Sequence, residues 1–274
     1  MKPTLSIIIV SFNTKSLTLD AISSVYQEGS NLSIQIIVID NNSQDGSVEA
    51  LRNLASKYEN FLLIENSGNL GFAKANNQGI KKAKDEYILL LNSDTVVKKG
   101  ALGKLVNFAK ETPDAGVVGP RLLNKDGSVQ KGCYHFPTIG RAISEYWLGR
   151  KGYFDSFAPQ GGFPVTVDVL VGAAFLITPK ALKKVGLLDE RYFFYFDDID
   201  YCRRVWREGL KVYYYPKAEI VHLVGASGKK IADPANQWRR LIPSSKIYHG
   251  TLKHYLLTFI LWLGQKWEKI FKKN

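Results

Sequence analysis

The expected fold is decided by one stretch near the start of the chain, Leu5-Ser6-Ile7-Ile8-Ile9-Val10-Ser11. A continuous apolar run of this length is typical of a strand that is buried on both faces of a sheet. Apolar residues then recur at helical spacing over residues 17–26, and a second buried run over residues 34–39 ends at Asp40. This alternation of strand and helix predicts an α/β protein in which helices cover both faces of a mostly parallel sheet.

The same rhythm continues to about residue 120 and then changes. Strands are expected over residues 61–64, 87–91 and 116–118, and helices over 48–58, 72–83 and 101–110. Residues 132–164 are rich in aromatics and glycine with little periodicity, which predicts irregular or short helical structure. Further strands are expected over 165–178, 210–215 and 219–222, and helices over 179–185 and 197–208.

Polar side chains follow several of the predicted strands. Asn13, Asp40 and Asp94 all come directly after a buried run. The carboxyl ends of parallel strands meet at one edge of a sheet, and ligands bind in the crevice there. The sequence therefore predicts that these side chains gather around a ligand.

Asp94 is the first candidate metal ligand. The apolar run Leu89-Leu90-Leu91 leads directly into Asn92-Ser93-Asp94. Mg²⁺ and Mn²⁺ prefer oxygen ligands and often bridge a protein carboxylate to substrate phosphates. The alternative is that Asp94 only caps the turn that follows the strand.

An acidic cluster forms the candidate catalytic centre. Asp197, Asp198 and Asp200 follow four consecutive aromatics, residues 193–196. At the positive end of a helix the ionised form of these acids is favoured, and an ionised carboxylate is a credible general base for a hydroxyl. The alternative is plain helix capping, with Asp200 paired to Arg204 one turn later.

His222 is a second candidate metal ligand, because it ends a predicted strand and is followed by the small residues 225–228. A structural histidine is the alternative. The candidates for diphosphate contact are Lys229, Lys230, Arg239 and Arg240, with a solvated basic face as the alternative. The asparagine-rich loop of residues 66–77 has no Gly-x-Gly-x-x-Gly fingerprint, which argues against a dinucleotide-dependent oxidoreductase.

The end of the chain is strongly basic. Residues 226–274 hold ten Lys and Arg against two acids, so a net +8 of the chain's +12 lies there. The apolar run over residues 255–263 is shorter than the ~20 residues of a membrane-spanning helix. With Trp262, Trp267 and the flanking lysines it predicts a basic amphipathic helical segment lying on a membrane surface. A helix packed on the domain or in a dimer is the alternative, and nucleic acid is not expected.

Together these segments resemble glycosyltransferase family 2, the large inverting family with the GT-A fold, and in particular its rhamnosyltransferase-type members that build bacterial cell-surface polysaccharides. The resemblance covers about residues 5–227. The matching segments, in family order, are residues 5–13, 38–47, 69–79, 91–94, 172–176 and 186–190, the Asp197-Asp198-x-Asp200 cluster with Arg203, and His222.

The resemblance implies a role for each candidate residue. Asp198 matches the catalytic base, with Asp197 in the neighbouring acidic position. Asp94 and His222 match ligands of a Mn²⁺ or Mg²⁺ ion. The pattern departs at Asn92, where the family's Asp-x-Asp motif has its first acid, so the metal site is expected to be weaker or to depend more on His222. The residues expected to bind the nucleotide sugar are Ser11, Asn13, Asp40, Asn69, Asn77, Asn92 and Ser93.

The resemblance also sets the expected domains, substrates and location. Residues 1–227 form the catalytic domain, with a nucleotide-sugar-binding half (1–120) and an acceptor and catalytic half (121–227), and residues 228–274 form the basic extension. The expected reaction moves rhamnose from dTDP-rhamnose to a hydroxyl of a glycan or lipid-linked acceptor. The alternatives are a UDP-hexose or UDP-N-acetylhexosamine donor, or a catalytically weak nucleotide-sugar-binding protein. Two cysteines are too few for a disulfide framework, which favours the cytoplasm, at the inner face of the membrane.

Overall fold

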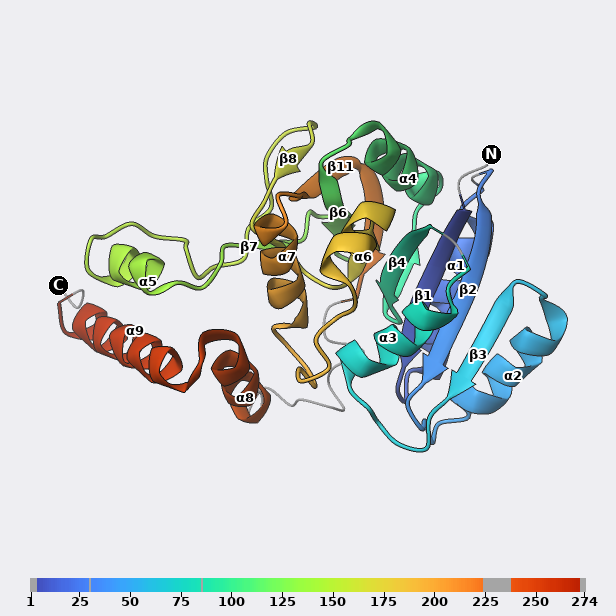
Figure 1. Cartoon of the computed structure of the whole chain (residues 1–274), viewed down its shortest axis with the longest axis horizontal. Coiled ribbons are helices and arrows are strands. Elements are labelled where there is room, and N and C mark those ends of the chain that lie inside the picture. The colour runs from blue at the N-terminus through green and yellow to red at the C-terminus, as the bar shows by residue number, and fades with distance from the viewer. Residues whose placement is uncertain (1–3, 30, 85, 224–237, 272–274) are drawn as a thin grey trace.

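The computed structural model of the chain describes residues 4–29, 31–84, 86–223 and 238–271 (Figure 1). Its first half contains the predicted parallel sheet. Strands β1 (Thr4–Ser11), β2 (Ser33–Asp40), β3 (Phe61–Glu65) and β4 (Tyr87–Asn92) lie in the order β3-β2-β1-β4, and all neighbours are parallel. The carboxyl ends of these four strands therefore lie at one edge.

The second half makes the sheet mixed. β10 (Ala174–Ile177) runs antiparallel between β4 and β6 (Ala115–Leu123). β11 (Lys211–His222) is parallel to β6 and antiparallel to β5 (Thr95–Val97) and β8 (Val165–Thr166). β7 (Cys133–Tyr134) and β9 (Val169–Leu170) form a small second sheet. The two strands expected over 210–222 are thus one strand with a bulge, and the strand expected over 165–178 is three short ones.

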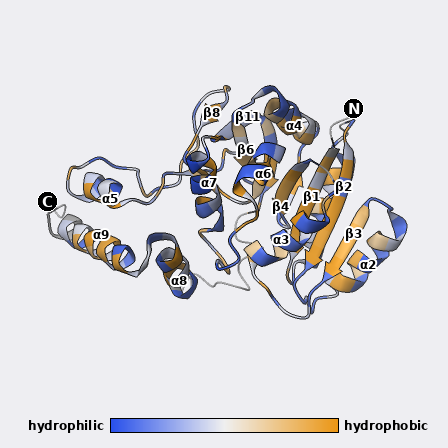
Figure 2. Cartoon of the chain, in the orientation of Figure 1, coloured by the Kyte–Doolittle hydropathy of each residue, from blue (hydrophilic) through white to orange (hydrophobic). Residues whose placement is uncertain are grey.

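Helices cover both faces of the large sheet, as predicted. Side chains alternate across a strand, so Ile7 and Ile9 point to one face and Ile8 to the other. The helices on the first face are α1 (Lys15–Gln27), α2 (Ser47–Lys57) and α4 (Ala101–Glu111). Those on the second face are α3 (Phe72–Lys82), α6 (Pro179–Val185) and α7 (Asp197–Arg207). The parallel strands β1, β2, β3 and β4 between them are mostly hydrophobic (Figure 2).

Three further helices lie to one side of the sheet. These are α5 (Ile139–Tyr146), α8 (Trp238–His249) and α9 (Thr251–Phe271), and α9 packs against both of the others (Figure 1). The rings of Trp147 and Trp267 lie 5.9 Å apart between α5 and α9. Among the described residues, no helix has both the length and the continuous hydrophobicity needed to cross a bilayer. Residues 224–237, which include Lys229 and Lys230, lie outside the described part of the chain.

A substitution at Gly79 tests how closely α3 packs on the sheet. A Cβ atom on Gly79 would lie 2.6 Å from Cγ2 of Ile8 and 3.0 Å from Cδ1 of Ile39, which is closer than packed atoms approach. We expect Gly79→Val to lower the free energy of unfolding by about 1–3 kcal/mol, measured by urea denaturation. Gly68→Val is the control, since nothing lies within 4 Å of its added Cβ. Equal stability of the two variants would contradict this packing.

Candidate active site

Two of the predicted metal ligands lie together in the structure. Asp94 is in the turn between β4 and β5, and β5 pairs with β11 so that Thr95 lies opposite His222. The amide N–H of Leu223 donates to the carbonyl of Asp94 at 2.9 Å. This pairing brings Nε2 of His222 to 3.5 Å from Oδ1 of Asp94, and both side chains are largely buried. The pairing of β5 with β11, two strands far apart in sequence, therefore brings Asp94 and His222 together.

Gln130 orients the His222 ring, and nothing in the sequence pointed to it. The side-chain N–H₂ of Gln130 donates to the carbonyl of His222 and to Oδ1 of Asn124, each at 3.0 Å. These two acceptors fix the amide, so its Oε1 faces Nδ1 of His222 at 2.7 Å and accepts the proton there. A neutral ring held in this tautomer presents the lone pair of Nε2 to the carboxylate of Asp94.

The Asp94–His222 pair fits a divalent cation. A carboxylate oxygen and an imidazole nitrogen that face each other across 3.5 Å are both electron donors, so a cation between them stabilises the arrangement. Within the described residues, no group of three or more His, Cys, Asp and Glu side chains gathers around one point. The pair therefore offers two protein ligands, which suits a cation that takes its other ligands from phosphate and water.

The acidic cluster is at the start of α7, and its members differ in their surroundings. Asp200 is buried and forms ion pairs with Arg203 at 2.6 Å and Arg204 at 2.8 Å, so the expected pairing one turn later is present. Asp198 instead accepts hydrogen bonds from the amide N–H groups of Gly172 at 3.0 Å and Ile199 at 2.8 Å. Asp200 thus stabilises the helix, whereas the Asp198 carboxylate is positioned by backbone N–H groups, one of them from Gly172 just before β10.

Burial raises the pKa of both Asp197 and Asp198 above the ordinary value of an aspartate. For Asp198 the two backbone N–H donors oppose this effect, because they stabilise the ionised form. For Asp197 the negative charge of Asp198 raises the pKa further. Asp197 therefore takes up a proton before Asp198 does, and Asp198 is the better placed of the two to act as a base.

The backbone before this cluster is strained. Tyr195 and Phe196 have φ angles of 68° and 70°, in the left-handed region that aromatic residues rarely adopt. Such a residue costs about 1–3 kcal/mol, which surrounding contacts must offset. The ring of Phe196 packs on Tyr248 and His249 of α8, with centroids 5.4 and 6.2 Å away. Contacts with α8 thus support the conformation that starts α7 at Asp197.

A short path of hydrogen bonds connects Asp198 to the segment that leads to Asp94. The amide N–H of Asn92 donates to the carbonyl of Ala173 at 2.9 Å, and the N–H of the adjacent Gly172 donates to Asp198. Asp94 follows Asn92 by two residues. The structure therefore brings Asp94, His222 and Asp198 to the same edge of the sheet.

The residues expected to bind the nucleotide sugar divide into two groups. Ser11, Asp40, Asn77 and Ser93 are each at most 2% exposed, and their polar atoms bond within the protein. Asp40 accepts from the amide and the hydroxyl of Ser43, both at 2.7 Å. The hydroxyls of Ser11 and Ser93 both lie within 3.5 Å of that of Thr14. Side chains this deeply buried shape the loops at the sheet edge.

Asn77 bonds to the segment that contains Leu188 and Glu190. Its amide donates to the carbonyl of Leu188 at 2.9 Å and accepts from the Leu188 N–H at 3.0 Å. It also donates to Glu190 at 3.0 Å. Asn77 therefore fixes the segment that leads to the acidic cluster.

Asn13, Asn69 and Asn92 form the second group, since each is partly exposed at the sheet edge. Asn13 has a φ of 53°, and its Oδ1 accepts from the N–H of Gln44 at 2.7 Å, which ties the loops after β1 and β2 together. Oδ1 of Asn69 accepts from the N–H of Gly71 at 2.9 Å. These three residues are the ones of the set that a ligand can reach.

Gly71 allows the asparagine-rich loop to cross the aromatic segment. Its φ is 80°, and an added Cβ would lie 2.5 Å from the carbonyl oxygen of Phe193. That same oxygen accepts from the N–H of Phe72 at 3.0 Å. Only glycine fits this crossing, and the Phe72 ring that follows lies near Gly172.

Comparison with known proteins shows the family of this chain. The family model described as "Glycosyl transferase family 2" matches residues 6–185, more than half of the chain. The chain belongs to this family. It is 28% identical over 206 residues to N-acetylglucosaminyl-diphospho-decaprenol L-rhamnosyltransferase of Mycobacterium tuberculosis. That match covers 69% of this chain and 66% of the relative, slightly less than two thirds of its length.

Another relative of this family 2 chain is the dTDP-rhamnosyl transferase RfbF of Shigella flexneri, 24% identical over 82% of this chain and 70% of the relative. Among solved structures, the mannosyltransferase PcManGT of Pyrobaculum calidifontis, in complex with GDP-Man and Mn²⁺, superimposes with a TM-score of 0.62. The superposition covers 97% of this chain and 74% of the mannosyltransferase chain, at 16% sequence identity. The predicted GT-A fold is thereby confirmed.

Replacing Gln130 tests whether it orients His222 for metal binding. In Gln130→Leu the His222 ring loses the acceptor that fixes its tautomer, so we expect the affinity for Mn²⁺ to fall about 10–100-fold in isothermal titration. Gln27→Leu, an exposed change on α1, is the control and should bind Mn²⁺ as the unaltered chain does. A folded Gln130→Leu protein with unchanged Mn²⁺ affinity would contradict the role of Gln130.

Proposed function

We propose that this family 2 glycosyltransferase moves one sugar from a nucleoside-diphosphate donor to a hydroxyl of a glycan or lipid-linked acceptor, with inversion at the anomeric carbon. One observation carries the proposal: Asp198, an acid held by backbone donors, lies at the same sheet edge as the Asp94–His222 pair. An acid on one side of the reacting carbon and a diphosphate site on the other is what a single in-line displacement requires.

In this mechanism Asp198 accepts the proton of the acceptor hydroxyl as the oxygen forms its bond to the anomeric carbon. The bond from that carbon to the donor diphosphate breaks in the same step. The N–H of Gly172 keeps the Asp198 carboxylate in place, because one of its oxygens is bonded there at 3.0 Å. Burial and the negative charge of Asp198 raise the pKa of Asp197, which favours its protonated form and so a single negative charge beside the acceptor.

Asp94 and His222 would hold the Mn²⁺ or Mg²⁺ ion. A divalent ion bound there neutralises charge on the departing diphosphate. Gln130 keeps His222 in the tautomer that can bind it. Asn92, where an acid is common in the family, has its backbone N–H bonded to Ala173 and is partly exposed, so its amide side chain is available to the donor.

The proposed donor is dTDP-rhamnose. The support is the printed activity of two relatives, an L-rhamnosyltransferase and a dTDP-rhamnosyl transferase. The first of these names also supports an acceptor carried on a lipid diphosphate and a role in cell-surface polysaccharide synthesis. A UDP-hexose or UDP-N-acetylhexosamine donor is the alternative, and a panel of nucleotide sugars tested for protection against thermal unfolding separates them.

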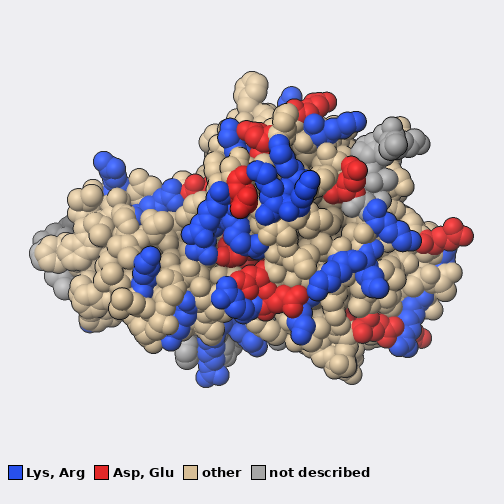
Figure 3. Space-filling view, viewed as in Figure 1, with Lys and Arg blue, Asp and Glu red and all other residues tan. Residues whose placement is uncertain are grey.

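We also propose that α9 rests on the membrane that carries such an acceptor. Its exposed side chains include Leu252, Tyr255, Phe259 and Trp262, which recur on one face of the helix. The surface over α8 and α9 is mostly uncharged with scattered Lys and Arg (Figure 3). Apolar side chains with interspersed cations suit an anionic lipid surface. The two cysteines are free and buried, which supports work on the cytoplasmic side.

Asp198→Asn tests the catalytic base. An amide cannot take the proton, so we expect kcat to fall about 10²–10⁴-fold while the dissociation constant of the donor changes little. Turnover with Mn²⁺ and its loss on adding EDTA would be measured alongside, with exposed Asp155→Asn as the control. Unchanged turnover in Asp198→Asn would remove this residue from the role.

The pH dependence of kcat/KM provides a second test. A base must be ionised to act, and burial raises the pKa of Asp198. Activity should therefore fall on acidification at a higher pH than the ~4 of an ordinary aspartate. Asp197→Asn should leave this acid limb largely in place, since burial and the charge of Asp198 raise the pKa of Asp197 and favour its neutral form. An acid limb at or below pH ~4 would contradict the raised pKa.

The proposed membrane contact is tested by Phe259→Ser combined with Trp262→Ser. Losing two large exposed apolar side chains should weaken binding to anionic phospholipid vesicles about ten-fold or more in co-sedimentation. Phe163→Ser is the control, because Phe163 is 80% exposed but lies outside α9. Unchanged vesicle binding, or a dimer that dissociates in the double variant, would contradict the membrane role.

A further inference from the structure

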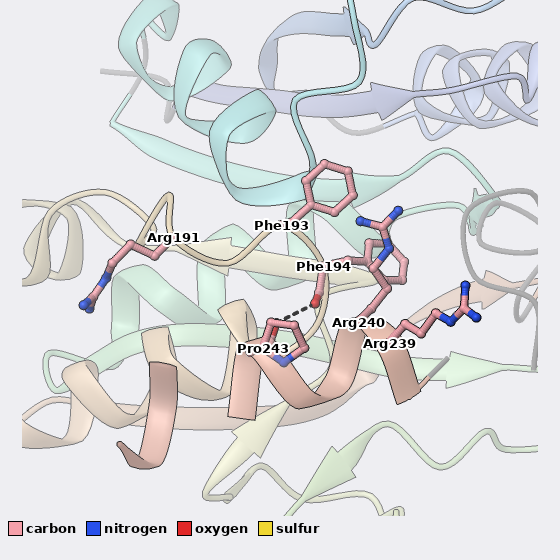
Figure 4. A pocket seen from close by; sticks show the side chains of 7 residues that line it. Arg191, Phe193, Phe194, Arg239, Arg240 and Pro243 are labelled. Carbon is pink, nitrogen blue, oxygen red and sulfur yellow. Dashed lines mark hydrogen bonds between the residues drawn. The ribbon is translucent and has the colours of Figure 1, made fainter. Parts of the chain in front are cut away.

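A pocket of about 110 Å³ lies beside the acidic cluster, and the proposed reaction does not use it. Its walls are the segment before α7, which includes Phe193 and Phe194, and the first turns of α8, which include Arg240 and Ser244 (Figure 4). The hydroxyl of Ser244 donates to the carbonyl of Phe194 at 2.9 Å, which fixes α8 to that segment. The pocket is therefore formed by structure that is held in place on both sides.

Arg240 is the group in this pocket that suits an anion. Its guanidinium carbon lies 4.5 Å from the centre of the Phe193 ring, and Figure 4 shows the two side chains beside each other. A guanidinium resting on a ring keeps the N–H groups at its edge available to an oxyanion. Among the residues that the structure describes, no carboxylate pairs with Arg240, whereas Arg191 is bound by Asp189 on the opposite side of the pocket.

The pocket is close to the acid along a chain of contacts. Phe193 bonds to the N–H of Phe72, and Phe72 and Asp198 both lie within 4 Å of the position that a Cβ on Gly172 would occupy. The metal pair is reached from Gly172 in the other direction, through Ala173 and Asn92. Asp198 therefore lies between the Asp94–His222 pair and the pocket in this sequence of contacts.

We propose that the Arg240 pocket binds the phosphoryl group of the acceptor. This rests on the proposed function: the donor diphosphate belongs at the Asp94–His222 pair, so a separate anion site, joined to the region of Asp198 through Phe193 and Phe72, belongs to the other substrate. α8 also contacts α9, whose exposed apolar face is where a lipid chain would lie. The acceptor is thus a sugar carried on a lipid phosphate or diphosphate, with its phosphoryl group at Arg240 and its hydroxyl toward Asp198.

The first experiment measures the anion site without the reaction. Inorganic pyrophosphate is titrated calorimetrically into the full chain in EDTA, so that the metal pair cannot hold it. Losing a charge-assisted hydrogen bond should weaken binding about 10–100-fold in Arg240→Gln and less in Arg240→Lys. Arg207→Gln, an exposed arginine on α7 outside the pocket, is the matched control. Equal affinity in Arg240→Gln and the control, or no binding at all, would overturn the proposal.

The second experiment assigns the anion to the acceptor. Transfer is measured to N-acetylglucosamine carried either on a short isoprenyl diphosphate or on a neutral octyl group. We expect Arg240→Gln to raise KM about ten-fold or more for the diphosphate acceptor alone, with KM for the octyl acceptor and for the donor unchanged. An equal rise for both acceptors, or a rise in donor KM, would overturn the assignment. Pyrophosphate binding that depends on Arg240, in a chain that transfers no sugar, would support the pocket and contradict the proposed function.

Discussion

The reversed strand β10 is the constraint on which the site depends. It lies between β4 of the parallel half and β6 of the mixed half, and the residues just before it bond to both sides: Ala173 to Asn92, and Gly172 to Asp198. Strand pairing sets positions to within a residue, because a slip by one residue turns every side chain to the other face. The position of the acid relative to the Asp94 turn is therefore fixed by backbone.

The three acids at the start of α7, Asp197, Asp198 and Asp200, have different electrostatic surroundings and therefore different roles. Asp200 is neutralised by two arginines and holds the helix. Asp197 is buried and Asp198 is partly buried, and neither has an arginine partner among the ion pairs of the described residues. Desolvation raises the pKa of each, and Asp198 also accepts a hydrogen bond from the backbone N–H of Gly172 at the sheet edge. The raised pKa of Asp197 favours its protonated form and leaves Asp198 as the better proton acceptor. The strained backbone at Tyr195 and Phe196 leads directly into both acids.

Local sequence patterns predicted most of the fold but only part of the candidate site. The run at residues 5–11 predicted a buried parallel strand because periodicity and burial are local properties. Asp94 and His222 could be named from strand ends, but their approach depends on β5 pairing with β11, which no local pattern encodes. For the same reason Gln130 was missed: it acts across 92 residues of sequence. The direct roles given to Asp40 and Asn77 stay predictions, since both are buried and bonded within the protein.

The central claim is that a divalent ion bound by Asp94 and His222 holds the donor diphosphate opposite Asp198. A crystal of the chain grown with Mn²⁺ and dTDP, with data recorded at the manganese absorption edge, measures this directly. The account predicts an anomalous peak between the Asp94 carboxylate and Nε2 of His222, in contact with the diphosphate. A peak elsewhere, or nucleotide bound at the sheet edge with no manganese between these two side chains, would contradict it.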